Sequence, residues 1–287
     1  MDTVVAAPNA LLDRAIAGPT HVRVRAGRIV DVRPGCPDES PGPAVWRFDH
    51  GLLTPGLVDI QINGAVGVDF ADVTDRSLRV VANWLPTTGV TRFLPTLITA
   101  PVPVIVEQAR EVLAASTGLT GAQPLGVHLE GPFLSSVRHG VHDPSLMVDP
   151  SQALVDRILE LGPRVVTIAP ERDGALSAIR ALTAAGVLVS VGHTDATAAQ
   201  TRAAADAGAR MITHLFNAQR GLGHREPGVP GAGFTDERFT LGLIADLAHV
   251  APDVCKLVFQ VASSRVALVT DAVAAAGMPP GRYQLGG

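Results

Sequence analysis

Three residues with metal-binding side chains stand at or near the ends of short apolar runs. Glu130 follows the run in GVHLEG, His193 ends LVSVGH, and His214 lies in RMITHLFN. A buried carboxylate costs several kcal/mol unless a partner compensates its charge. One carboxylate and two imidazoles are a known ligand set for a catalytic divalent metal ion. We therefore expect Glu130, His193 and His214 to bind a metal, although either histidine taken alone could equally be an ordinary core residue.

A catalytic metal site also needs a side chain that moves protons, and Asp271 in LVTDA is the candidate. A bound divalent metal lowers the pKa of water toward about 7 and polarises a carbonyl group. A nearby carboxylate can accept a proton from that water and return it to a leaving amine. The alternative is that Asp271 caps a following helix.

The elements that must position these residues form one repeating pattern. Apolar runs that end in polar residues alternate with Ala-rich helical patterns, such as those at 103–115, 151–161, 173–185 and 195–207. The apolar runs cover residues 56–64, 91–98, 124–131, 165–171, 188–193, 210–217, 240–246 and 266–272. Eight such units predict an α/β fold, a (β/α)8 TIM-like barrel, whose active site lies at the C-terminal ends of the strands.

The N-terminal region follows a different pattern. Residues 20–33 alternate apolar and polar residues on both sides of Ala26-Gly27-Arg28, which predicts a β-hairpin. We expect a small β domain over residues 1–54, the N-terminal half of a β-sandwich. The metal-dependent barrel is then expected over residues 55–287.

Composition argues against several classes of protein. The net charge is −4 without a basic patch, so we expect no nucleic-acid partner. The sequence has no run of about 18 apolar residues, so we expect no membrane span. Cys36 and Cys255 lie far apart, which argues against a disulfide scaffold or a thiolate zinc site. With no signal-peptide pattern at the N-terminus, a cytoplasmic protein is expected.

A set of motifs, in order along almost the whole chain, closely resembles the N-acetylglucosamine-6-phosphate deacetylase family of the amidohydrolase superfamily. The resemblance implies metal-dependent hydrolysis of the N-acetyl group of N-acetyl-D-glucosamine 6-phosphate. The products would be D-glucosamine 6-phosphate and acetate, in amino-sugar catabolism and cell-wall amino-sugar recycling. The motifs are TPGLVDIQING, GVHLEGPFL, HGVHDP, TIAPE, SVGHTDA, THLFNAQ…REPG, LIADLAHV and LVTDAVAAAGMPPGRYQLGG.

The resemblance also implies roles for residues at matching positions. Glu130, His193 and His214 would bind the metal, and Asp271 would be the general base and acid. His142, in HGVHDP, would contact the amide carbonyl of the substrate and stabilise the oxyanion, unless it is simply an exposed loop residue.

Further positions would bind the sugar phosphate. The resemblance implies contacts from Asn217, the backbone of Ala218, His249 and Arg225, with Arg225 reaching the neighbouring site of a homodimer. A phosphate dianion independently favours an arginine fork. The simpler alternatives are a solvated loop charge for Arg225 and a helix-start residue without a partner for His249.

We expect one metal ion rather than two. Many relatives in the superfamily begin the barrel with His-x-His, where this chain has Gln61 and Asn63, and neutral amides are poor zinc ligands. The single lysine, Lys256, is not at a strand end, so no carboxylated lysine bridges two metals. Gln61 could hold a water on the metal. Zinc is the expected ion, with iron, manganese and cobalt as alternatives.

The chain departs from the family pattern after YQLGG, where the family continues with a last barrel helix and strands that complete the β-sandwich. We therefore expect an incomplete sandwich and reduced stability.

Two other functions stay open: a different mononuclear amidohydrolase, such as another amino-sugar deacetylase or a cyclic amidase, and a truncated inactive fragment that only binds sugar phosphate.

Overall fold

The computed structural model describes residues 2–37 and 44–283. The chain divides into two compact units, Met1–Gly56 and Leu57–Gly287. Each unit has its own sheet, so we describe the two separately.

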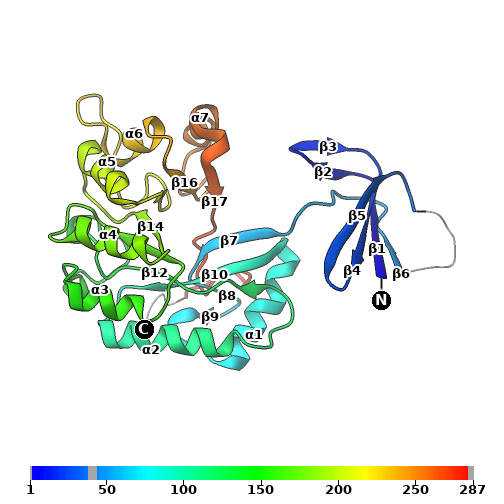
Figure 1. Cartoon of the computed structure of the whole chain (residues 1–287), viewed down its shortest axis with the longest axis horizontal. Helices are drawn as coiled ribbons and strands as arrows, with labels where there is room; N and C mark the ends of the chain where they lie inside the picture. Colours follow the sequence, from blue (N-terminus) through cyan, green and yellow to red (C-terminus); the bar gives the residue numbers. More distant parts are fainter. Residues whose placement is uncertain (1, 38–43, 284–287) are drawn as a thin grey trace. The chain divides into compact units, whose positions relative to one another are not determined.

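The first unit is built on a four-stranded sheet (Figure 1). The strand order is β5 (Arg28–Pro34), β4 (Thr20–Arg25), β1 (Asp2–Ala7) and β6 (Ala44–Arg47). A separate pair is formed by β2 (Ala10–Leu12) and β3 (Ala15–Ala17).

The predicted hairpin over residues 20–33 is β4 and β5. Ala26 and Gly27 connect the two strands with φ of 49° and 74°. Two consecutive left-handed residues give the turn whose twist suits a hairpin. The sequence pattern did not indicate β1 or β6, since DTVVAA and AVWR lack a regular alternation.

The second unit confirms the predicted (β/α)8 barrel. Eight parallel strands pair in order around it. They are β7 (Leu57–Ile62), β10 (Val90–Ile98), β12 (His128–Glu130), β13 (Val165–Ile168), β14 (Leu188–Val191), β15 (Met211–Ile212), β16 (Thr240–Leu243) and β17 (Val266–Leu268). The chain just after β17 nearly closes the barrel onto β7, because the Asp271 N–H donates to the Gln61 carbonyl at 2.9 Å. Three short strands lie outside this ring: β8 (Gly64–Ala65), β9 (Val68–Asp69) and β11 (Gln123–Pro124).

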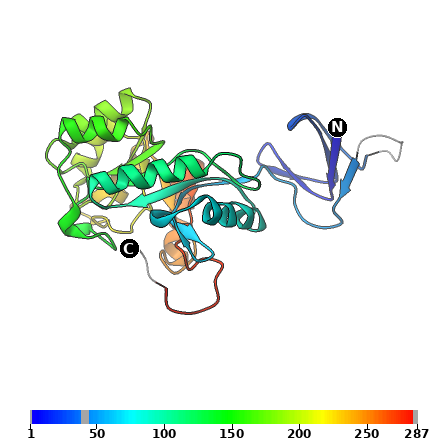
Figure 2. The same cartoon turned by 90° about the horizontal axis from the view of Figure 1, so that it is seen from below.

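Helices lie around the outside of the strands (Figures 1 and 2). They are α1 (Asp75–Trp84), α2 (Val102–Ala115), α3 (Gln152–Leu159), α4 (Ala175–Ala184), α5 (Ala198–Ala207), α6 (Gly228–Thr235) and α7 (Pro252–Ala262). Short 3-10 helices are η1 (Phe70–Asp72), η2 (Leu85–Thr88), η3 (Ser136–Arg138), η4 (Pro144–Leu146) and η5 (Ser263–Arg265). The predicted helical patterns correspond to α2, α3, α4 and α5. Within residues 2–37 and 44–283, no helix is both long and apolar enough to cross a membrane.

A layer of buried polar side chains lies inside the barrel, within two residues of the strand ends. His128 Nε2 is 2.8 Å from Thr167 Oγ1, which in turn is 2.9 Å from Thr213 Oγ1. Ser190 Oγ lies 2.6 Å from the same Thr213 hydroxyl. These bonds connect four neighbouring strands, β12 to β15, so the layer helps to fix the spacing of their C-terminal ends.

Gly192 lies between β14 and His193 and allows this layer to pack closely. A Cβ at Gly192 would be 2.6 Å from Thr213 Cβ and 2.9 Å from Thr167 Cγ2. Real Cβ contacts are not that short, so any larger residue must displace the two threonines.

We predict that Gly192→Ala lowers the free energy of unfolding by about 1–3 kcal/mol, because overpacking a dense interior strains its neighbours. Urea denaturation followed by helical circular dichroism measures this. Gly221→Ala is the matched control, since nothing lies within 4 Å of a Cβ there. Equal stability of the two variants would contradict the prediction.

Candidate metal centre and active site

A cavity of about 280 Å³ opens where the barrel strands end. It is lined mainly by residues on the segments that follow the strands, as expected for an active site in this fold. Among the residues proposed from the sequence, the cavity is lined by Glu130, His142, His193, His214, Asn217, Ala218, His249 and Asp271.

The three predicted metal ligands converge at one point of this cavity. Glu130 Oε1 lies 3.0 Å from His214 Nε2 and 3.3 Å from His193 Nε2, and the two Nε2 atoms are 3.1 Å apart. Tetrahedral ligands at about 2.0–2.1 Å from a metal are about 3.3 Å from one another. The three buried side chains therefore fit a small divalent cation.

The charge balance at this point also fits a cation. Burial alone would raise the pKa of Glu130, but the hydrogen bonds and charges of His193 and His214 outweigh it and hold that pKa well below its usual range. Burial disfavours a charged His214, yet its bond to Glu130 raises the pKa of His214 to about 9. In the absence of a metal, a proton on His214 therefore compensates the buried carboxylate.

The backbone sets the tautomer of His193. Its Nδ1 lies 3.1 Å from the Arg138 carbonyl oxygen, which can only accept a hydrogen bond. Nδ1 of a neutral His193 therefore carries the proton, and Nε2 has a free lone pair beside Glu130. This is the usual support of a metal-binding histidine.

Unusual backbone conformations turn three of these side chains into the cavity. His193, His214 and Asp271 have φ of 45°, 25° and 49°. Residues other than glycine rarely adopt this left-handed region, and such strain persists where the surrounding structure enforces it. The strand ends are therefore shaped for the site rather than for local backbone preference.

Asp271 is held beside the three ligands as a partly shielded carboxylate. Its Oδ1 accepts hydrogen bonds from Asn63 Nδ2 at 2.7 Å and from Gln61 Nε2 at 3.1 Å. Burial, and then the charge of Glu130, raise the pKa of Asp271 above its usual range. A raised pKa suits a group that accepts a proton and later returns it.

Gln61 joins the two acidic groups of the site. The same Nε2 that contacts Asp271 donates to Glu130 Oε1 at 2.9 Å. The amide of Gln61 thus lies between both carboxylates. The expected bond from Gln61 to a water on the metal stays a prediction.

His142 is buried, so its interpretation as an exposed loop residue is wrong. The Thr99 N–H donates to His142 Nδ1 at 3.2 Å, so the proton of the neutral ring is on Nε2. Burial, and then the neighbouring His193, lower the pKa of His142 to about 4, which keeps the ring neutral at pH 7. Its Nε2 has no hydrogen-bond partner among the described residues and lies 3.8 Å from Glu130 Oε2. It can therefore donate to a ligand in the cavity.

Of the residues expected to contact the substrate, some line the cavity and Arg225 does not. Asn217 and Ala218 line the cavity, as does His249, whose Nδ1 is 2.7 Å from Asp246 Oδ2. The alternative that His249 has no partner is therefore wrong. The backbone and ring of His249 lower the pKa of Asp246 to about 2. Arg225 is exposed and does not line the cavity.

Two supporting contacts were not found from the sequence. Thr99 orients His142, and the Arg138 carbonyl orients His193. Arg138 acts through a backbone atom. Thr99 acts through its backbone N–H and also through its hydroxyl, which lies 2.9 Å from His142 Nδ1, and no motif or spacing indicated either contact.

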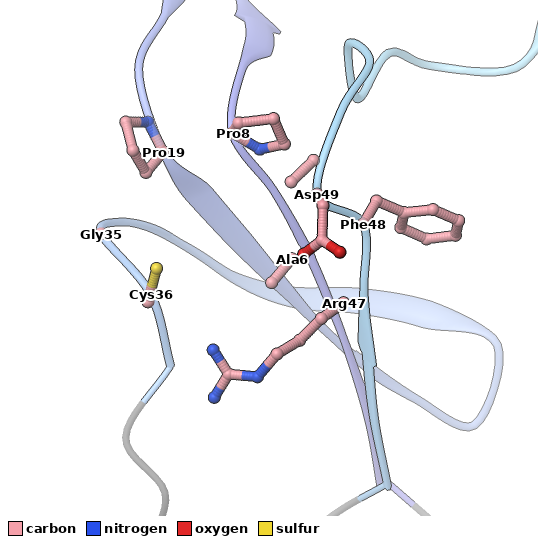
Figure 3. A pocket seen from close by; sticks show the side chains of 9 residues that line it. Ala6, Pro8, Pro19, Gly35, Cys36, Arg47, Phe48 and Asp49 are labelled. Carbon is pink, nitrogen blue, oxygen red and sulfur yellow. The ribbon is translucent and has the colours of Figure 1, made fainter.

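A second cavity, of about 250 Å³, lies in the first unit (Figure 3). Its lining includes Pro8, Cys36, Arg47 and Asp49. Among the described residues, the only group of three or more metal-binding side chains is Glu130, His193 and His214. The chemistry is therefore to be sought in the barrel.

Comparisons with known proteins identify relatives of this chain. No protein-family model matches the chain. The N-acetylgalactosamine-6-phosphate deacetylase of Escherichia coli O157:H7 is 43% identical over 248 residues, which cover 85% of this chain and 66% of the relative. The human N-acetylglucosamine-6-phosphate deacetylase is 40% identical over 282 residues, covering 92% of this chain and 68% of the relative.

A solved structure gives the same result. N-acetyl-D-glucosamine-6-phosphate deacetylase from Mycobacterium smegmatis, a mutant in complex with N-acetyl-D-glucosamine-6-phosphate, superimposes with a TM-score of 0.85 at 40% identity. The match covers 99% of this chain and 74% of that one. This chain spans about two thirds of the length of the curated relatives it matches. These similarities establish that the chain belongs to the N-acetylglucosamine-6-phosphate deacetylase family.

Proposed function

We propose that this chain hydrolyses the N-acetyl group of N-acetyl-D-glucosamine 6-phosphate, giving D-glucosamine 6-phosphate and acetate. The reaction would serve amino-sugar catabolism and cell-wall amino-sugar recycling. The observation that carries the proposal is the convergence of Glu130, His193 and His214 beside Asp271 and His142 in one cavity. The two free cysteines are consistent with the cytoplasmic location that we also propose.

Glu130, His193 and His214 would hold one divalent ion. We propose zinc, with iron, manganese or cobalt as alternatives that the same ligands accept. When bound there, the ion would acidify water and polarise the acetamide carbonyl.

The protein side chains would move the protons and bind the oxyanion. Asp271, fixed by Asn63 and Gln61, accepts a proton from the attacking water and delivers it to the leaving nitrogen. His142 donates from Nε2 to the oxygen of the acetyl group as negative charge develops on it. The neutral tautomer fixed by Thr99 supports this role.

The sugar phosphate would be bound at the rim of the cavity. Asn217, Ala218 and His249 line the cavity, which supports the proposal that the Asn217 and His249 side chains and the Ala218 backbone contact the sugar phosphate. We propose that Arg225 binds the phosphate of the neighbouring site in a homodimer. Its exposed position outside the cavity of its own chain is consistent with that role.

N-acetylgalactosamine 6-phosphate is a second candidate substrate, because of the name of one relative. The Escherichia coli relative is named for N-acetylgalactosamine 6-phosphate. A deacetylase for that sugar phosphate would use the same metal, base and oxyanion contacts, and would differ only in its contacts to the sugar. A cyclic amidase or an inactive fragment would lack either the need for phosphate or the release of acetate.

We predict that the metal-loaded protein releases acetate from N-acetyl-D-glucosamine 6-phosphate, and that Asp271→Asn lowers kcat by about 10²–10⁴-fold because the proton acceptor is lost. Enzymatic acetate determination measures the rate, and elemental analysis checks that the variant still binds one metal. Equal rates of variant and wild type, or a metal-loaded wild type that releases no acetate, would refute the proposal.

We predict that Arg225→Ala raises KM for the phosphorylated substrate at least tenfold, because a charge-assisted contact to the phosphate is lost. KM for unphosphorylated N-acetylglucosamine should not change, which serves as the control. If the arginine acts across a dimer, mixing Asp271→Asn with Arg225→Ala subunits should restore the wild-type KM, because the Arg225→Ala subunit keeps Asp271 and receives Arg225 from its partner. An unchanged KM for the phosphorylated substrate would exclude the phosphate role.

A further inference from the structure

We propose that Asp195 is a positioning residue that fastens the segment carrying His142 onto the metal ligand His193. This inference rests on the proposed function. Asp195 lies in the SVGHTDA motif, two residues after His193. Asp195 itself has no role in the chemistry described above.

The carboxylate of Asp195 pairs with two arginines from different segments of the chain. Its Oδ1 lies 2.9 Å from Arg138 Nε, and its Oδ2 pairs with Arg220 Nη2. Arg220 Nε also donates to the Asp195 carbonyl oxygen at 2.7 Å. The Asp195 N–H is fixed in turn by Glu171 Oε1 at 2.6 Å. The carboxylate is therefore held in one orientation between its partners.

The segment that carries Arg138 packs against His193 and forms hydrogen bonds with it. The carbonyl of Arg138 accepts from His193 Nδ1, and the Ser135 N–H donates to the His193 carbonyl at 2.8 Å. A Cβ at Gly140, where φ is 59°, would be only 3.0 Å from His193 Cε1. His142 follows two residues later. The side-chain pair between Arg138 and Asp195 thus holds a segment that sets the tautomer of one ligand and places the oxyanion donor.

The Arg220 segment carries residues of the substrate rim. The Thr194 N–H donates to the Ala218 carbonyl at 3.1 Å, and the Arg220 N–H donates to the Thr194 carbonyl at 3.0 Å. Asp195 therefore connects three segments around the metal site: the one with His142, the one with His193 and the one with Ala218.

The effect of these pairs should be on geometry more than on global stability. The side chains of Asp195, Arg138 and Arg220 are 24%, 39% and 36% exposed. Partly exposed ion pairs contribute little to the free energy of unfolding. Contacts that orient metal ligands from behind, however, commonly change metal affinity or activity by about 10–100-fold.

Asp195→Asn tests the assignment because it keeps the shape and removes the charge. We expect Co²⁺ affinity, measured by competition with a chelator, and kcat to fall about tenfold or more. The matched control is Asp236→Asn. Asp236 pairs with Arg238 at 2.6 Å and, within residues 2–37 and 44–283, forms no hydrogen bond or ion pair with a residue of the site, so affinity and kcat should stay within about twofold of wild type.

A spectroscopic readout separates positioning from general support of the fold. The visible absorption of bound Co²⁺ should change in Asp195→Asn and in Arg138→Gln, and stay unchanged in Asp236→Asn. The double variant Asp195→Asn/Arg138→Gln should lose little more than either single variant, because both remove the same contact.

Unchanged Co²⁺ affinity and spectrum in Asp195→Asn would overturn the inference, as would fully additive losses in the double variant. Loss of folding in both single variants would also overturn it, since the pairs would then support the whole unit. The metal readouts do not require turnover. A wild type that binds Co²⁺ but releases no acetate would therefore reject the proposed function and leave the positioning role to be judged on affinity and spectrum.

Discussion

The site depends on compensating one buried charge, the carboxylate of Glu130 at the end of β12. An isolated carboxylate in such a place is too costly to keep ionised. Two imidazoles meet it at hydrogen-bonding distance, and a cation fits the space between the three groups. His193 and His214 adopt rare backbone conformations to reach it. The local strain at these strand ends is thus offset by the charge balance that they make possible.

The remaining groups of the site follow from the same charge. Glu130 helps to raise the pKa of Asp271, and the amide of Gln61 lies between both carboxylates. His142 is kept neutral by burial, with its donor nitrogen facing the cavity. A base with a raised pKa and a neutral donor with a lowered pKa, set on either side of a metal site, suit attack of water on an amide.

Much of this arrangement could be predicted from the sequence because parallel strands bring their C-terminal ends together. Glu130, His193 and His214 lie far apart in the chain, and the repeat alone indicated that they meet. The alternation across Ala26 and Gly27 likewise gave the hairpin. In both cases a regular pattern carries the information.

Other features depend on tertiary contacts that leave no pattern. His142 lies in an irregular segment, and no spacing in the sequence reveals its burial or its contacts with Thr99. The roles of His142 and Arg225 came from family resemblance rather than from their surroundings. Arg225 is exposed and outside the cavity of its own chain, and the contact proposed for it with a second copy would leave no pattern in one chain.

The most direct test of the central claim is the number of protons released when the metal binds. Since the pKa of His214 is raised to about 9 by Glu130, its ring is charged at pH 8 without a metal and must be neutral to bind one. Calorimetric titration with Zn²⁺ at pH 8, in two buffers of different ionisation enthalpy, should give one ion bound and between one and two protons released per chain. One proton comes from His214, and the rest comes from water on the ion, whose pKa falls toward about 7. Metal binding without proton release, or no binding at this site, would contradict the claim that a cation replaces the proton beside Glu130.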